Sequence, residues 1–121
     1  MTYENRRKIE DLGVPEDVIE RDGAVSESVA CAMAKGARLA SGSDIAVATT
    51  GIAGPGGGTS DKPVGFVWIA VSDIEGEHAR LFRYPGNRHL VRDRTAKSAL
   101  QSVRFRVLGV RAPLLWQDRS E

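Results

Sequence analysis

The chain has little of what disulfides and metal centres need. Its 121 residues include one cysteine, Cys31, and two histidines, His78 and His89, which are far apart in the sequence. An internal disulfide is therefore excluded, and so is a zinc site built from several cysteines. Because no other residue pairs with Cys31 in the sequence, we expect an unreactive thiol. We expect no metal site and no cofactor.

Long apolar runs are also missing. No segment approaches the roughly 18 apolar residues that span a bilayer. The opening residues, MTYENRRKIEDLG, lack the apolar stretch of a signal peptide. We therefore expect a cytoplasmic protein with no membrane partner. A hydrophobic fraction of 41% and a charged fraction of 27% predict one soluble domain with a modest core.

Acidic residues are nearly absent between residues 88 and 111. In that segment Asp93 is the one acidic residue and seven residues are basic, although the net charge of the whole chain is only +1. Two interpretations stay open, namely a solvated basic helix face and a binding site for an anion such as phosphate or nucleic acid. No aromatic stacking platform accompanies these arginines, which disfavours a nucleic-acid partner.

The residue pattern predicts three helices, then one strand, a loop, two further strands and a long helix. Ser26 and Asn87 are suited to cap the third and last helices, and Gly109 to end the last one. Four-residue spacing predicts one buried stripe in each of these helices. The helices are expected over 5–14, 15–23, 24–40 and 88–109, the strands over 44–50, 65–72 and 78–84, and the stripes at Val25, Val29, Met33 and Ala37 and at Ala96, Leu100, Val103 and Val107.

This order predicts an α/β fold with helices layered on a mixed sheet. Three strands make a thin sheet for four helical segments. We expect one domain over residues 1–109, followed by a tail over residues 110–121, whose LLW cluster shows no periodicity.

The most distinctive segment is TTGIAGPGGGTSDKPVG, residues 49–65. It is not a P-loop, because no Lys-Ser or Lys-Thr follows the glycines, and it contains no G-x-S-x-G nucleophile turn. It leaves the end of a buried strand, where α/β sheets bind ligands. Its hydroxyls and its successive backbone N–H groups suit an anion. A flexible connection between two strands remains the alternative.

Three segments together resemble one family. TTGIAGPGGGTSDKPVGFVWIAV, preceded by GAVSESVACAMAKGAR and followed by FRYPGNRHLVRDRT, closely resembles the C-terminal domain of the CinA family over residues 2–108. The resemblance implies a dimeric α/β/α sandwich that acts in the pyridine nucleotide cycle. It also implies metal-free hydrolysis of nicotinamide mononucleotide to nicotinate mononucleotide and ammonia.

The resemblance also implies the roles of individual residues. The family uses a serine in an ESCTGG-like turn, assisted by a tyrosine and a lysine in a Y-x-N-x-x-K segment, which YENRRK matches here. A lysine of lowered pKa can activate such a serine against a poorly electrophilic amide. The implied catalytic residues are Tyr3 and Lys8, and the implied substrate-binding residues are Asn5, Thr50, Gly51, Ile52, Ala53, Gly54 and Arg88.

The sequence departs from the family at one point, because no ESCTGG-like segment precedes Tyr3. We therefore expect an N-terminally truncated domain without the family's first helix and nucleophile-bearing strand. Three explanations stay open: a fragment of an amidase, a short nucleotide-binding or dimerisation module without catalysis, or a domain completed by a second polypeptide. Since loss of the nucleophile removes most catalysis, we expect the 121 residues alone to be essentially inactive.

Overall fold

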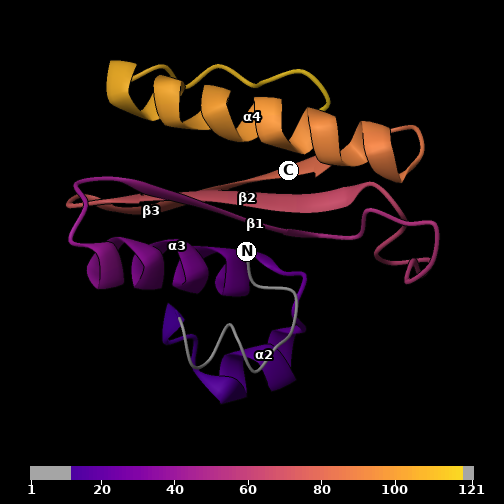
Figure 1. Ribbon diagram of the computed structural model, residues 1–121, viewed down its shortest axis with the longest axis horizontal. Coiled ribbons are helices and arrows are strands. Elements are labelled where there is room, and N and C mark those ends of the chain that lie inside the picture. The colour runs from indigo at the N-terminus through magenta and orange to yellow at the C-terminus, as the bar shows by residue number, and fades with distance from the viewer. Residues whose placement is uncertain (1–11, 119–121) are drawn as a thin grey trace.

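The computed structural model describes residues 12–118 and places a sheet between two helical layers (Figure 1). Helix α3 covers one face of the sheet, with α2 packed against α3, and α4 covers the other face. The predicted α/β class and its α/β/α layering are confirmed. The helix predicted over residues 5–14 lies largely outside the described residues. The elements are α2 (Glu16–Asp22), α3 (Glu27–Ser41), β1 (Ala46–Gly51), β2 (Phe66–Asp73), β3 (Gly76–Arg83) and α4 (Arg88–Leu108).

The described sheet has the order β1-β2-β3 and is antiparallel throughout, whereas the sequence analysis predicted a mixed sheet. The reason lies in the connections. A tight turn joins β2 to β3, and the 52–65 loop returns the chain from β1 directly to β2. Parallel neighbours need a long crossover, usually a helix, and no crossover helix joins these three strands.

Strand β2 is the centre of the core. Its seven residues from Phe66 to Ser72 are all buried, as its uninterrupted apolar sequence predicts. Alternate side chains face opposite layers. Trp68 and Ala70 pack in a cluster with Val29 and Met33 of α3, while Val67 and Ile69 share a second cluster with Phe82, Tyr84 and Val91.

Helices α3 and α4 begin where the predicted capping residues lie, and α4 also ends at the predicted glycine. The Val29 N–H donates to Ser26 Oγ over 3.3 Å, and the Leu90 N–H donates to Asn87 Oδ1 over 3.0 Å. Gly109 ends α4 with a left-handed φ of 72°.

The predicted buried stripe of α4 is wrong. Leu100 is 72% exposed and Val107 is 69% exposed, while the helix buries Val91 and Ser102. Ser102 satisfies its hydroxyl within the helix by donating to the Ser98 carbonyl over 2.8 Å. The face of α4 that meets the sheet is therefore partly small and polar, so apolar spacing does not reveal it.

The segment after α4 docks on strand β3. Gln117 forms a bridge with Phe82, and the Asp118 N–H donates to the Leu81 carbonyl over 2.8 Å. The Arg83 N–H donates to the Trp116 carbonyl over 3.0 Å. The described part of the expected tail therefore pairs with the outer edge of the sheet. None of the helices within residues 12–118 has both the length and the apolar character of a bilayer span.

Candidate functional site

The structure brings together two of the motifs that the sequence analysis selected, the glycine-rich loop after β1 and the start of α4. Arg88, the first residue of α4, donates from Nη1 to the Gly54 carbonyl over 3.0 Å. Within residues 12–118 the Arg88 side chain forms no other hydrogen bond or ion pair. Tyr3, Asn5 and Lys8 lie outside the described residues.

Thr50 has a structural hydrogen bond. Its side chain is buried at 7% exposure, and Oγ1 donates to the Ala24 carbonyl over 2.7 Å. This bond fixes the end of β1 to the segment that enters α3. Because the hydroxyl hydrogen is already used, Thr50 can offer a ligand only its acceptor lone pairs.

Gly51 and Gly54 are explained in part by packing. A Cβ on Gly51 would lie 2.5 Å from Val67 Cγ2, which leaves no room for a side chain against β2. Gly54 has a φ of +84°, and a Cβ there would lie 2.7 Å from Val64 Cγ1. These glycines let the two ends of the loop approach closely, so close approach to a ligand is not their only purpose.

The two ends of the loop are paired, and its middle is open. The Ile52 N–H donates to the Phe66 carbonyl over 3.0 Å, and the Gly65 N–H donates to the Ile52 carbonyl over 2.7 Å. Ala53 packs against the cluster beneath α4. Between these fixed points, the exposed N–H groups of residues 56–58 donate to no acceptor within the described part of the chain. Successive unpaired N–H groups of this kind can hold an anion.

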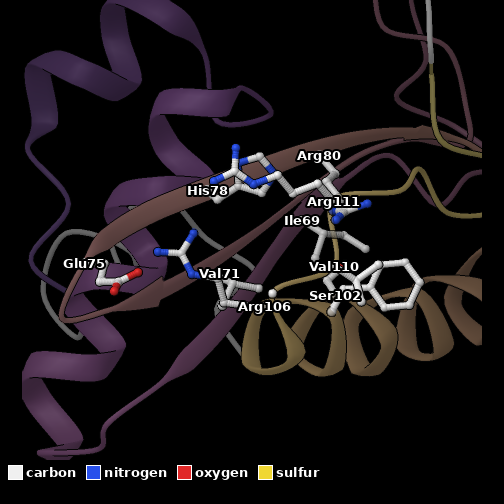
Figure 2. A pocket seen from close by; sticks show the side chains of 11 residues that line it. Ile69, Val71, Glu75, His78, Arg80, Ser102, Arg106, Val110 and Arg111 are labelled. Carbon is white, nitrogen blue, oxygen red and sulfur yellow. The ribbon is translucent and has the colours of Figure 1, made fainter.

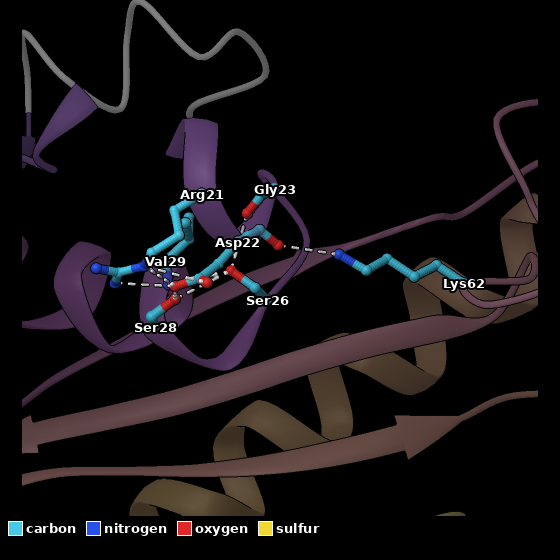
Figure 3. A network of polar contacts seen from close by, with 7 residues as sticks. All are labelled: Arg21, Asp22, Gly23, Ser26, Ser28, Val29 and Lys62. Carbon is cyan, nitrogen blue, oxygen red and sulfur yellow. Dashed lines mark hydrogen bonds and ion pairs between the residues drawn. The ribbon is translucent and has the colours of Figure 1, made fainter. Parts of the chain in front are cut away.

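Lys62 and Asp22 belong to the same neighbourhood, although the sequence analysis did not select them. Lys62 Nζ donates to the Asp22 carbonyl over 3.2 Å, which ties the loop to the turn between α2 and α3 (Figure 3). The Asp22 carboxylate accepts from Arg21 and from Ser28 Oγ, and these hydrogen bonds, with that from Arg21 first, lower its pKa. The sequence feature that could have indicated Lys62 is its position in the DKPVG part of the loop.

The serines of this neighbourhood have capping and structural roles. Ser26 Oγ donates to the Gly23 carbonyl over 2.8 Å and accepts from the Val29 N–H, and Ser28 Oγ donates to Asp22 Oδ2 over 2.7 Å. Neither hydroxyl is hydrogen-bonded to a lysine or histidine of residues 12–118 that would activate it.

Cys31 is poorly suited to act as a nucleophile in this fold. Burial, followed by the charges of Glu27 and Glu77, raises the pKa of Cys31 to about 11, so it stays a protonated thiol at neutral pH. Among residues 12–118, no three His, Cys, Asp or Glu side chains gather to hold a metal ion.

A family match accounts for this combination of glycine loop, capped helix and PGNR segment. The CinA C-terminal domain family matches residues 1–107. The chain belongs to the CinA family. The resemblance predicted from the three sequence segments is thereby confirmed.

Individual CinA relatives agree with this assignment. A CinA-like protein of Geotalea daltonii is 52% identical over 108 residues, which cover 89% of this chain and 26% of the relative. A CinA-like protein of Akkermansia muciniphila is 52% identical over 104 residues, covering 85% of this chain and 25% of the relative. The chain thus spans about a quarter of the length of these curated relatives.

Solved CinA structures share the fold. A competence/damage inducible protein from Agrobacterium tumefaciens has a TM-score of 0.82 and 41% identity, with 84% of this chain and 63% of that chain covered. A CinA superfamily protein from Escherichia coli has a TM-score of 0.80 and 32% identity, covering 84% of this chain and 59% of that one. The chain therefore shares the architecture of both proteins but covers less than two thirds of each.

Proposed function

We propose that this CinA-family chain carries the nucleotide-binding side of a nicotinamide-nucleotide amidase. The substrate is nicotinamide mononucleotide, and the products are nicotinate mononucleotide and ammonia. The observation that carries the proposal is the 3.0 Å hydrogen bond between Arg88 and Gly54, which sets a cationic side chain beside the open glycine loop. A guanidinium and unpaired N–H groups are the donors that a nucleotide phosphate requires.

The hydrolytic step needs a nucleophile in addition to these donors. A serine Oγ attacks the carboxamide carbon, its proton passes through Lys8 to the departing amine, and ammonia leaves. Water then cleaves the acyl-serine ester and releases the carboxylate product. Tyr3 orients the serine in this scheme. Because the sequence contains no ESCTGG-like segment, the 121 residues alone bind the nucleotide without hydrolysing it.

The test is calorimetric titration of the purified 121-residue chain with nicotinamide mononucleotide, with ammonia release measured in parallel. We expect saturable binding, weakened about tenfold by Arg88→Gln, since a charge-assisted phosphate contact contributes roughly 1.5 kcal/mol or more. Arg104→Gln makes the same charge change at an exposed position of the same helix and should leave the affinity unchanged. The proposal fails if the chain does not bind the nucleotide, or if both variants bind like the parent.

The second candidate is a nucleotide-binding or dimerisation module that takes part in no hydrolysis. It shares the Arg88–Gly54 contact, so binding alone does not separate the two. The two candidates are separated by adding a polypeptide that carries an ESCTGG-like segment, because only the amidase then releases ammonia. Ammonia release by the 121 residues at an ordinary enzyme rate would overturn the expected inactivity.

The proposal includes a homodimer in the cytoplasm. Cys31 has no disulfide partner, as is usual in a reducing compartment. Sedimentation velocity at two protein concentrations measures the association state, and a monomer at both concentrations would rule out the dimer.

A further inference from the structure

A cavity lies at the far end of α4 from the glycine loop. It has a volume of about 430 Å³ and opens between α4 and strands β2 and β3 (Figure 2). Ligand pockets in proteins span about 300 to 1,000 Å³, so this one is large enough for a small molecule. Part of its lining is apolar, from side chains that include Ile69, Val71 and Phe105, and part is cationic, from Arg80, Arg106 and Arg111.

Arg80 is a buried cation that pairs with no carboxylate of residues 12–118. Its exposure is 7%, and its Nη1 donates to the Ala112 carbonyl and to Gln117 Oε1, each over 2.9 Å. Both acceptors are neutral, and burial lowers the pKa of this guanidinium. The guanidinium also lies over the Phe105 ring, 5.5 Å from its centroid. A counter-ion stabilises a buried charge, and since the described part of the chain places none beside Arg80, an anion in the cavity would supply it.

Other groups make this end of the cavity positive. Arg111 forms no hydrogen bond or ion pair with residues 12–118. The pKa of His78 is lowered, first by desolvation and then by the charges of Arg80 and Arg106. Among the described residues, Arg106 is the one of these three arginines that pairs with a carboxylate, through two hydrogen bonds of 2.7 Å to Asp73.

The carboxylate in the lining does not cancel this charge. Figure 2 shows Glu75 at the opposite end of the cavity from Arg80 and Arg111, beyond Arg106. The cavity is thus polarised, with a cationic end and with apolar walls from Ile69 and Phe105 beside it.

We propose that this cavity binds a small molecule that carries a phosphate group. The phosphate lies between Arg80 and Arg111, whose planar guanidinium groups suit its oxygens, and an apolar portion of the ligand packs on Ile69 and Phe105. The site is distinct from the glycine loop, because the helix between Arg88 and Ser102 alone extends about 20 Å. It does not depend on the amidase proposal.

The test uses two probes, inorganic phosphate and phenyl phosphate, titrated into the full 121-residue chain with chloride used to hold ionic strength constant. We expect both to bind, and phenyl phosphate to bind the more tightly because its ring reaches the apolar wall. Arg111→Gln should weaken both about tenfold, since it removes one charged contact. Arg111 is exposed and forms no hydrogen bond or ion pair with residues 12–118, so this variant should fold normally. Arg104→Gln is the matched control and should bind like the parent.

Amide chemical shifts locate the bound probe. The proposal requires changes around Ser102, Phe105 and Gly109, and it is overturned if changes are confined to residues 51–58. Equal affinity of the parent chain and Arg111→Gln, or no binding of either probe, also overturns it. Because Arg88→Gln should weaken nicotinamide mononucleotide but not phenyl phosphate, failure here is distinguishable from failure of the amidase proposal.

Discussion

Arg106 donates two hydrogen bonds of 2.7 Å to the carboxylate of Asp73, one from Nε and one from Nη2. The pair joins the last turns of α4 to the turn between β2 and β3. Both side chains are partly screened by solvent, with exposures of 23% and 21%. The hydrogen bonds from Arg106 are the main reason why the pKa of Asp73 falls to about 2.

Asp73→Asn should lower the free energy of unfolding by about 1 kcal/mol at pH 7, since a partly exposed ion pair is discounted for screening. The pKa of Asp73 is depressed on folding, so its contribution is present above the unfolded value near 4 and is lost as the pH falls towards 2. The difference between parent and variant should therefore shrink over that range. Urea unfolding at several pH values measures it.

Asp93→Asn is the control for this prediction. Asp93 also pairs with a cation, Lys97 at 2.9 Å, but the two side chains are 46% and 74% exposed. Because solvent screens this exposed pair, its replacement should leave the stability nearly unchanged. An equal loss in both variants would mean that the Asp73–Arg106 pair has no special role in fixing α4.

Thr50→Val tests whether Thr50 serves the fold or a ligand. Valine has nearly the same side-chain shape as threonine but cannot form the 2.7 Å hydrogen bond to the Ala24 carbonyl. The Ala24 carbonyl therefore loses one hydrogen-bond donor. We expect a loss of about 1 to 2 kcal/mol in the free energy of unfolding without any ligand present. Thr49→Val, on the other face of β1, should stay within about 0.5 kcal/mol. A stable Thr50→Val variant that has lost nucleotide binding would contradict the structural role.

The elements that sequence analysis predicted well are those that depend on near neighbours. Ser26 and Asn87 cap helices through N–H groups three residues later, and the apolar run of β2 reports burial on both faces. The contacts that it missed join distant segments. Lys62 and Asp22 are 40 residues apart, and no local pattern marks their hydrogen bond.

Only part of the site was predicted, again because its contacts join segments that are distant in the sequence. Arg88 and the loop were selected separately, from a resemblance, and their 3.0 Å contact depends on how α4 crosses the sheet. The cavity near Arg80 was not predicted at all. In the sequence Arg80 is one polar position of an alternating strand, and its burial follows only from the docking of the segment that contains Ala112 and Gln117.

Gly65→Ala should be strongly destabilising. Gly65 has a φ of +94°, and a Cβ there would lie 2.0 Å from the Tyr84 carbonyl oxygen, a backbone atom that cannot move aside alone. We expect a loss of at least about 2 kcal/mol, measured by thermal or urea unfolding. Gly56 is the control, because a Cβ there meets nothing within 4 Å. Equal stability of the two alanine variants would show that the loop closes differently.

Val91→Ala and Leu100→Ala test which face of α4 is buried. Val91 is 1% exposed and packs with Phe82 and Tyr84, so losing two methyl groups there should lower the free energy of unfolding by about 1.5 kcal/mol. Leu100 is 72% exposed, and alanine is a good helix former, so its replacement should change stability by less than about 0.5 kcal/mol. Apolar spacing alone places Leu100 in the buried stripe and therefore predicts a large loss of stability there. A larger loss at Leu100 than at Val91, in monomeric protein at low concentration, would mean that α4 turns its Ala96–Leu100 face to the sheet.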